Sequence, residues 1–127
     1  MARPPARELT ARELEIMHVF WTCGESTVQD VRDALANGGS ERAYTTVATL
    51  VRILHDKKFV EQTNDQRPFR YRSVRSYEKV SASLLRDVLD RVFRGSREQL
   101  LVRLTEHKRL TAKERAVLEQ ILKEQQQ

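Results

Sequence analysis

The stretch from Arg42 to Lys58 constrains the fold of this chain more than any other. Its apolar residues recur at the spacing of a helix that buries one face, at Val47, Leu50, Val51 and Leu54. The opposite face is rich in hydroxyl groups and carries no acidic residue; it consists of Tyr44, Thr45, Ala48, Thr49 and Arg52. Short hydroxyl side chains and an arginine on a rigid helix suit the DNA major groove, where they reach bases and phosphates. A threonine-rich surface helix without a ligand is the alternative interpretation.

The residues after this helix predict a β-hairpin. Two β-branched and aromatic segments, 59–63 and 69–74, flank the turn-forming sequence Asn-Asp-Gln-Arg-Pro at 64–68. Alternation along the second strand places Arg70 and Arg72 on one side and Phe69 and Tyr71 on the other. A helix followed by an arginine-edged hairpin is the order of elements in a winged helix-turn-helix.

Positive charge is concentrated in this region. Residues 42–72 contain seven Lys or Arg and three Asp or Glu, while the whole chain of 127 residues carries a net charge of +5. Phosphate binding is the simplest physical use of such a local excess.

Two shorter helices are predicted before the central one. Thr10 and Glu13 form the capping-box pattern at the start of a helix that runs to about Cys23, and Gly24 ends it. Ser26 or Thr27 caps a second helix, followed by a loop at 37–40. With the hairpin, these helices form a predicted winged-helix DNA-binding domain over residues 1–75.

Residues 76–127 contain only helical patterns, which are broken at Gly95 and restarted by a capping box at Thr111 and Glu114. Three short helices with so much apolar surface make a poor core alone. We therefore expect a helical dimerisation domain that a second copy of the chain covers, although folding back as a monomer is the alternative. The residues predicted to lie between subunits are Leu84, Val88, Val92, Leu100, Leu104, Leu118 and Ile121.

Composition and motifs exclude several other classes of protein. The sequence shows no hydrophobic signal segment, no apolar run long enough for a membrane helix, and one cysteine, Cys23, so a cytoplasmic location is expected. The Cys and His spacings fit no metal site, and Cys23 is predicted to be a small buried residue. Because no phosphate-binding glycine loop or nucleophile–base motif occurs, we expect no cofactor, no small-molecule substrate and no enzyme activity.

The predicted DNA contacts fall into two groups. Base edges are assigned to the first turns of the central helix, at Tyr44, Thr45, Thr46 and Thr49, with Thr46 ranked lower because its position also fits an inward orientation. Phosphates are assigned to Arg42, Arg52, Arg67, Arg70 and Arg72. A winged helix that docks on proteins without specific DNA binding is the alternative function.

The chain resembles the penicillinase repressor family, which includes the methicillin-resistance repressors and copper-responsive relatives. The resemblance rests on Leu-Thr-Ala-Arg-Glu-Leu-Glu-Ile-Met at 9–17, Thr-Val-Gln-Asp-Val at 27–31, Ala-Tyr-Thr-Thr-Val-Ala-Thr-Leu-Val-Arg at 43–52 and Arg-Tyr-Arg at 70–72. It runs through residues 9–123 and implies a dimeric repressor of a palindromic operator, with interlocked C-terminal helices.

The resemblance also implies a route of induction. In the antibiotic-responsive members, a membrane sensor protease cuts the C-terminal domain between an Asn and a Phe. The aligned pair in this sequence is Arg103 and Leu104. The cysteine pairs of the copper-responsive members are absent from the C-terminal sequence, which ends Lys-Glu-Gln-Gln-Gln. The operator sequence, the regulated genes and the inducing signal are therefore left open.

Overall fold

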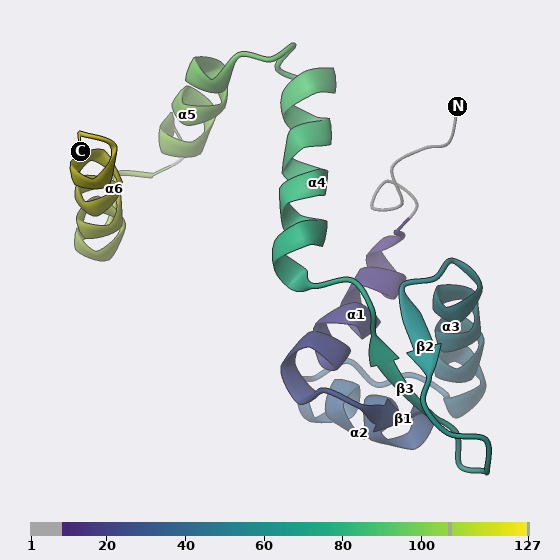
Figure 1. The fold of residues 1–127 in the computed structure, drawn as a ribbon. Coiled ribbons are helices and arrows are strands. Elements are labelled where there is room, and N and C mark those ends of the chain that lie inside the picture. Colours follow the sequence, from purple (N-terminus) through teal and green to yellow (C-terminus); the bar gives the residue numbers. More distant parts are fainter. Residues whose placement is uncertain (1–8, 107, 127) are drawn as a thin grey trace. The chain divides into compact units, whose positions relative to one another are not determined.

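The computed structural model describes residues 9–106 and 108–126. Figure 1 shows its helices and its small sheet. The elements in chain order are α1 (Ala11–Cys23), β1 (Ser26–Thr27), α2 (Val28–Asn37), α3 (Tyr44–Asp56), β2 (Val60–Gln62), β3 (Arg70–Ser73), α4 (Tyr77–Arg91), α5 (Arg97–Glu106) and α6 (Ala112–Gln125). The predicted fold class, mainly helical with a small hairpin in winged-helix order, is confirmed.

The chain divides into two compact units, Met1–Leu85 and Arg86–Gln127, which are called the N-terminal and C-terminal units below. The first turns of α4 belong to the N-terminal unit, because Val80 is buried in its core and Leu84 packs against that core. The remainder of α4, with α5 and α6, belongs to the C-terminal unit.

Three helices begin at threonine capping boxes. The Thr10 hydroxyl accepts from the backbone N–H of Glu13, and the Glu13 carboxylate accepts from the backbone N–H of Thr10, both at 3.2 Å. Thr27 with Asp30 at α2, and Thr111 with Glu114 at α6, repeat this arrangement. These bonds satisfy N–H groups that a helix start otherwise leaves without partners. The caps at Thr10 and Thr111 were predicted, and of the two predicted candidates for α2, Ser26 and Thr27, the cap is Thr27.

The sheet has three antiparallel strands in the order β1-β3-β2. β2 and β3 form the predicted hairpin, with Glu61 opposite Arg72. β1 was not predicted; its residue Thr27 lies opposite Arg70 and also caps α2. The sheet therefore joins the start of α2 directly to the wing strand β3.

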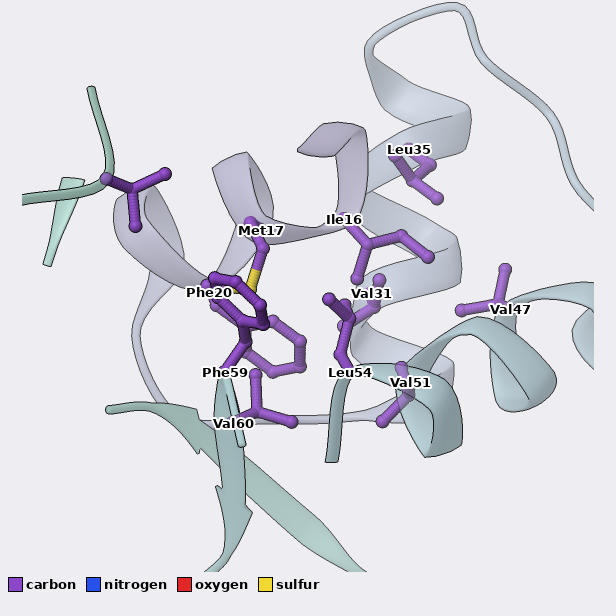
Figure 2. Close-up of a cluster of buried hydrophobic side chains, with 11 residues drawn as sticks. Ile16, Met17, Phe20, Val31, Leu35, Val47, Val51, Leu54, Phe59 and Val60 are labelled. Carbon is purple, nitrogen blue, oxygen red and sulfur yellow. The ribbon is translucent and has the colours of Figure 1, made fainter. Parts of the chain in front are cut away.

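The core of the N-terminal unit lies where α1, α2 and α3 meet the hairpin. Figure 2 shows side chains from all three helices pointing toward one another, with Phe59 and Val60 closing the cluster. Phe59, Met17, Leu54, Val31 and Val47 have no exposed surface. Burying each such side chain contributes roughly 1.5–3 kcal/mol, so this cluster fixes the position of α3.

The prediction that Cys23 is buried is wrong. Its side chain is exposed rather than buried. The buried stripe of α1 ends at Phe20, and the helix stops at Gly24, whose N–H donates to the Phe20 carbonyl. Cys23 therefore lies on the last turn, beyond the core that its neighbours fill.

Candidate nucleic-acid interface

α3 is anchored on one face and open on the other. Val47, Val51 and Leu54 are buried, whereas Tyr44 is 47% exposed and Thr49 and Arg52 are exposed. The N-cap residue, Ala43, makes no side-chain capping bond, and the first turn has no acidic residue. The first N–H groups of α3 are thus not capped by a side chain, and an anion is favoured at such a helix start.

A surface groove of about 620 Å³ brings α3 together with the start of α2 and the wing. None of its lining residues is acidic. Four of them, Tyr44, Thr49, Arg52 and Arg67, belong to the predicted DNA contacts. The remaining lining residues are Thr27, Val28, Gln29, Ala48, Pro68, Phe69 and Tyr71. Hydroxyl, aromatic and guanidinium groups therefore converge on one open surface, without a carboxylate that would repel phosphate.

The other predicted base-contacting residues differ in exposure. Thr45 is exposed on α3 but does not line the groove, and Thr46 is half-buried beside the fully buried Val47. Thr46 is therefore less available to a ligand than Thr45 or Thr49.

Four of the five predicted phosphate-binding arginines fall into two sets. Arg42 pairs with Glu15 at 3.4 Å, and Arg72 pairs with Glu61 across the hairpin. Within residues 9–106 and 108–126, no acidic side chain forms an ion pair with Arg52 or Arg67, and the Arg67 guanidinium lies 5.4 Å from the centre of the Phe69 ring. Arg52 and Arg67 are thus two cations of the groove that a phosphate meets without first displacing a carboxylate.

Arg70 is exposed on β3 and influences the start of α2. The backbone N–H of Thr27 donates to the Asp30 carboxylate at 3.0 Å, and this bond does most to hold the pKa of Asp30 below its ordinary value. The Thr27 hydroxyl and the positive charge of Arg70 act in the same direction, against a partial desolvation. Asp30 is therefore ionised at neutral pH, and it balances part of the charge of Arg70.

An ion pair with a buried carboxylate, which the sequence did not predict, holds the far end of α3. The Lys57 ammonium donates to both oxygens of Glu13, at 2.8 and 2.9 Å, and the Glu13 side chain is only 3% exposed. Glu13 also belongs to the capping box of α1. One carboxylate thus joins the start of α1 to the C-cap of α3, although its sequence pattern indicated only the capping role.

Two groove residues from α2 were also missed. Val28 and Gln29 follow the cap Thr27 and line the groove beside Thr49. The Gln29 amide donates to Asp33 at 2.8 Å, which leaves its carbonyl oxygen as an acceptor. The helical pattern of α2 could have identified Gln29 as exposed, whereas Val28 is half-buried against the core, and only the fold places both next to α3.

The predicted dimerisation residues lie on α4, α5 and α6, except Val92, which follows the end of α4. Val88, Val92, Leu104, Leu118 and Ile121 are exposed, by 41%, 68%, 66%, 39% and 44% respectively. Leu100 is half-buried, and Leu84 is half-buried against the core of the N-terminal unit. α5 and α6 contain no buried residue.

Two further observations limit the kinds of site present. In the part of the chain that the structure describes, none of the helices combines the length and apolar character that a membrane crossing requires. Among the same residues, no three His, Cys, Asp or Glu side chains gather closely enough to hold a metal ion.

Comparison with known proteins identifies the family. The family model of the penicillinase repressors matches residues 9–124. The chain belongs to this family. It is 35% identical to the transcriptional regulator BlaI of Mycobacterium tuberculosis over 96 residues, which cover 74% of this chain and 69% of that protein. It is 21% identical to the methicillin resistance regulatory protein MecI of Mammaliicoccus sciuri over 117 residues, covering 91% and 93% of the two chains.

Solved structures agree on the fold of this penicillinase repressor family member. The complex structure of hsRosR-SG superposes with a TM-score of 0.55 at 18% identity, and the match covers 96% of both chains. At that identity, the likeness concerns the fold and not the ligand.

Proposed function

We propose that this chain is a sequence-specific DNA-binding transcriptional repressor that acts as a homodimer on a palindromic operator. The observation that carries the proposal is the groove in which the exposed face of α3, the start of α2 and the wing cations meet without an acidic residue. Membership of the penicillinase repressor family supports the same function, as do the relatives named as transcriptional and resistance regulators. Because a repressor acts where the DNA is, the proposed location of this protein is the cytoplasm.

The base-reading role belongs to the first turns of α3. Tyr44, Thr45 and Thr49 present hydroxyl groups that donate to and accept from base edges in the major groove, and Thr46 ranks below them. Because the buried side of α3 is fixed in the core, these groups meet DNA at little cost in conformational freedom.

The arginines hold the phosphate backbone. Arg52, Arg67 and Arg70 are exposed at the groove or on the wing strand. Arg42 and Arg72 exchange their carboxylate partners for phosphate, and this exchange reduces the net gain from each contact. Each phosphate contact adds to the salt dependence of binding, but it carries no sequence information.

A second copy of the chain covers the apolar residues of α4, α5 and α6 in this proposal. Side chains such as Val92 and Leu104, about two-thirds exposed, form with their neighbours a surface of the kind that marks an interface. Dimerisation matters for function, because linking two winged helices turns binding of the second half-site into an intramolecular event. The proposed division of labour follows: residues 1–75 bind DNA and residues 76–127 dimerise.

Release from DNA is proposed to act through the C-terminal helices. The pair aligned with the family's cleavage point, Arg103 and Leu104, is exposed on α5, and Arg103 pairs with Glu106 at 2.8 Å. Cleavage there by a membrane sensor protease would separate α6 from α4 and so remove part of the dimer surface. Because Arg and Leu stand where the family has Asn and Phe, a protease with a different preference is required.

The experiment compares two kinds of variant on duplex DNA. Thr45→Ala combined with Thr49→Ala should reduce the discrimination between a selected and a mixed-sequence duplex by roughly 1–3 kcal/mol per lost base contact. Arg70→Ala should weaken binding to both duplexes equally and lower the slope of log affinity against log salt by about one. Unchanged discrimination in the threonine variant would remove α3 as the reading element. No salt-dependent binding at all would favour a winged helix that docks on protein.

A further inference from the structure

The loop at the tip of the wing is organised around one side chain, Asn64. The loop joins β2 to β3, and its residues Asp65, Gln66, Arg67 and Pro68 are exposed, whereas Asn64 is half-buried. A polar, exposed loop of this kind is ordinarily the least ordered part of a domain. Order in this loop therefore depends on specific bonds, and the Asn64 side chain makes three of them.

The Asn64 side-chain amide acts both as a hydrogen-bond donor and as an acceptor. Its Nδ2 donates to the carbonyl oxygens of Gln66 at 2.9 Å and Pro68 at 3.2 Å, and its Oδ1 accepts from the backbone N–H of Arg70 at 2.8 Å. The Asn64 carbonyl in turn accepts from the Gln62 side chain at 2.6 Å. Two carbonyl groups of the loop and the first N–H of β3 are thus bound to one amide.

The Asn64 bonds involve the backbone next to Arg67 and the backbone of Arg70 itself. Gln66 and Pro68, whose carbonyls Asn64 holds, are the residues on either side of Arg67, and the third bond fixes the backbone of Arg70. The Arg67 guanidinium lies over Phe69, and both residues line the groove with Thr49 and Arg52. The loop thus holds Arg67 at the groove of α3 before any ligand arrives.

We infer that Asn64 is a positioning residue for DNA binding, which holds the wing tip folded so that Arg67 and Arg70 meet the backbone of the duplex that α3 reads. This inference rests on the proposed function. Asn64 itself does not contact phosphate. It keeps the loop ordered in the free protein, so that DNA binding does not carry the entropy cost of ordering it. Fixing the backbone of even one residue carries an entropy cost large enough to change an affinity about tenfold.

The test is a double-mutant cycle on a mixed-sequence duplex. Asn64→Ala alone should weaken binding by about tenfold, which corresponds to re-ordering roughly one residue of backbone. In a background that carries Arg67→Ala and Arg70→Ala, the same change should cost less than about twofold, because the wing then gains nothing from being ordered. A stabilising residue without a positioning role would give the same loss in both backgrounds.

Amide hydrogen exchange in the free protein checks the structural half of the inference. Asn64→Ala should speed exchange of the Arg70 N–H, whereas Gln66→Ala in the same loop should not, because it keeps all three bonds of Asn64. The melting temperature of the N-terminal unit should stay near that of the wild type in both variants, since the core is untouched.

The outcomes separate the two claims. Equal losses in both backgrounds, or an Arg70 amide that exchanges as in the wild type, would overturn the role of Asn64 while leaving the DNA-binding proposal intact. If the Arg67 and Arg70 changes leave affinity for the duplex unaltered, then the wing binds no phosphate, and the inference falls together with that part of the proposed function.

Discussion

Replacing Lys57 of the Glu13–Lys57 ion pair should lower the free energy of unfolding far more than replacing Glu13. In Lys57→Met, the Glu13 carboxylate stays buried, 3% exposed, and loses the ammonium that donates to both of its oxygens. Removing one partner of a buried pair costs roughly 3–5 kcal/mol. Because the Lys57 side chain is 26% exposed, we expect a value near the lower end, about 3 kcal/mol.

The reverse change, Glu13→Gln, leaves an ammonium that water already reaches. The new amide oxygen can still accept from the Thr10 N–H, as Glu13 Oε1 does at 3.2 Å. We therefore expect a loss of only about 1–2 kcal/mol, the scale of one hydrogen bond. The asymmetry between the two variants follows from burial and not from charge alone.

Urea unfolding followed by Trp21 fluorescence is a suitable assay, since Trp21 is the only tryptophan of the chain and lies on α1 of the N-terminal unit. Lys57→Met should lower the midpoint by more than about 1 M. Lys58→Met removes the same charge from the neighbouring exposed position and should change the midpoint little. A Lys57→Met midpoint equal to that of Lys58→Met, or a larger loss in Glu13→Gln, would refute the burial argument.

Two further changes test the other parts of the account. Leu104→Asp should give a monomer in sedimentation, because an unpaired charge is costly in an apolar seam; Gln120→Asp, on the side of α6 away from its apolar residues, should remain dimeric, and a Leu104→Asp dimer would contradict the proposed interface. Asp30→Asn should be less stable than the wild type at neutral pH. Since the folded-state pKa of Asp30 is lowered from 3.8, its contribution is present above that pH and is lost as pH falls through the lowered value. The difference in melting temperature should therefore close in acid, and a gap that persists there would assign the effect to something other than the charge.

Local patterns in the sequence were sufficient for most elements of the fold. The capping residues Thr10, Thr27 and Thr111 mark helix starts within the chain itself, and the apolar spacing of α3 identifies its buried face before any partner is known. The same apolar spacing also predicts much of the proposed DNA interface, because the residues of α3 that do not belong to its buried face lie on its exposed face.

Two of the features that the sequence did not reveal depend on residues far apart in the chain, and two others lie within a single segment. β1 is two residues long and shows no alternation, so only its pairing with β3 defines it. Glu13 meets Lys57 through the packing of α1 on α3. Cys23 was wrongly predicted to be buried, since a helix pattern does not say where the core ends. The bonds of Asn64 were hidden in a stretch that indicated only a turn.

Selection of duplexes from a random pool by the 127-residue chain tests the central claim most directly. If two copies of α3 read two half-sites, the enriched sequences should be palindromic, with half-site centres roughly one helical turn or a multiple of it apart. Thr45→Ala with Thr49→Ala should lose that enrichment while still retaining DNA. Enrichment of a single unrepeated site would contradict the dimer, and retention of DNA by the wild-type protein without any enriched sequence would contradict specific recognition by α3.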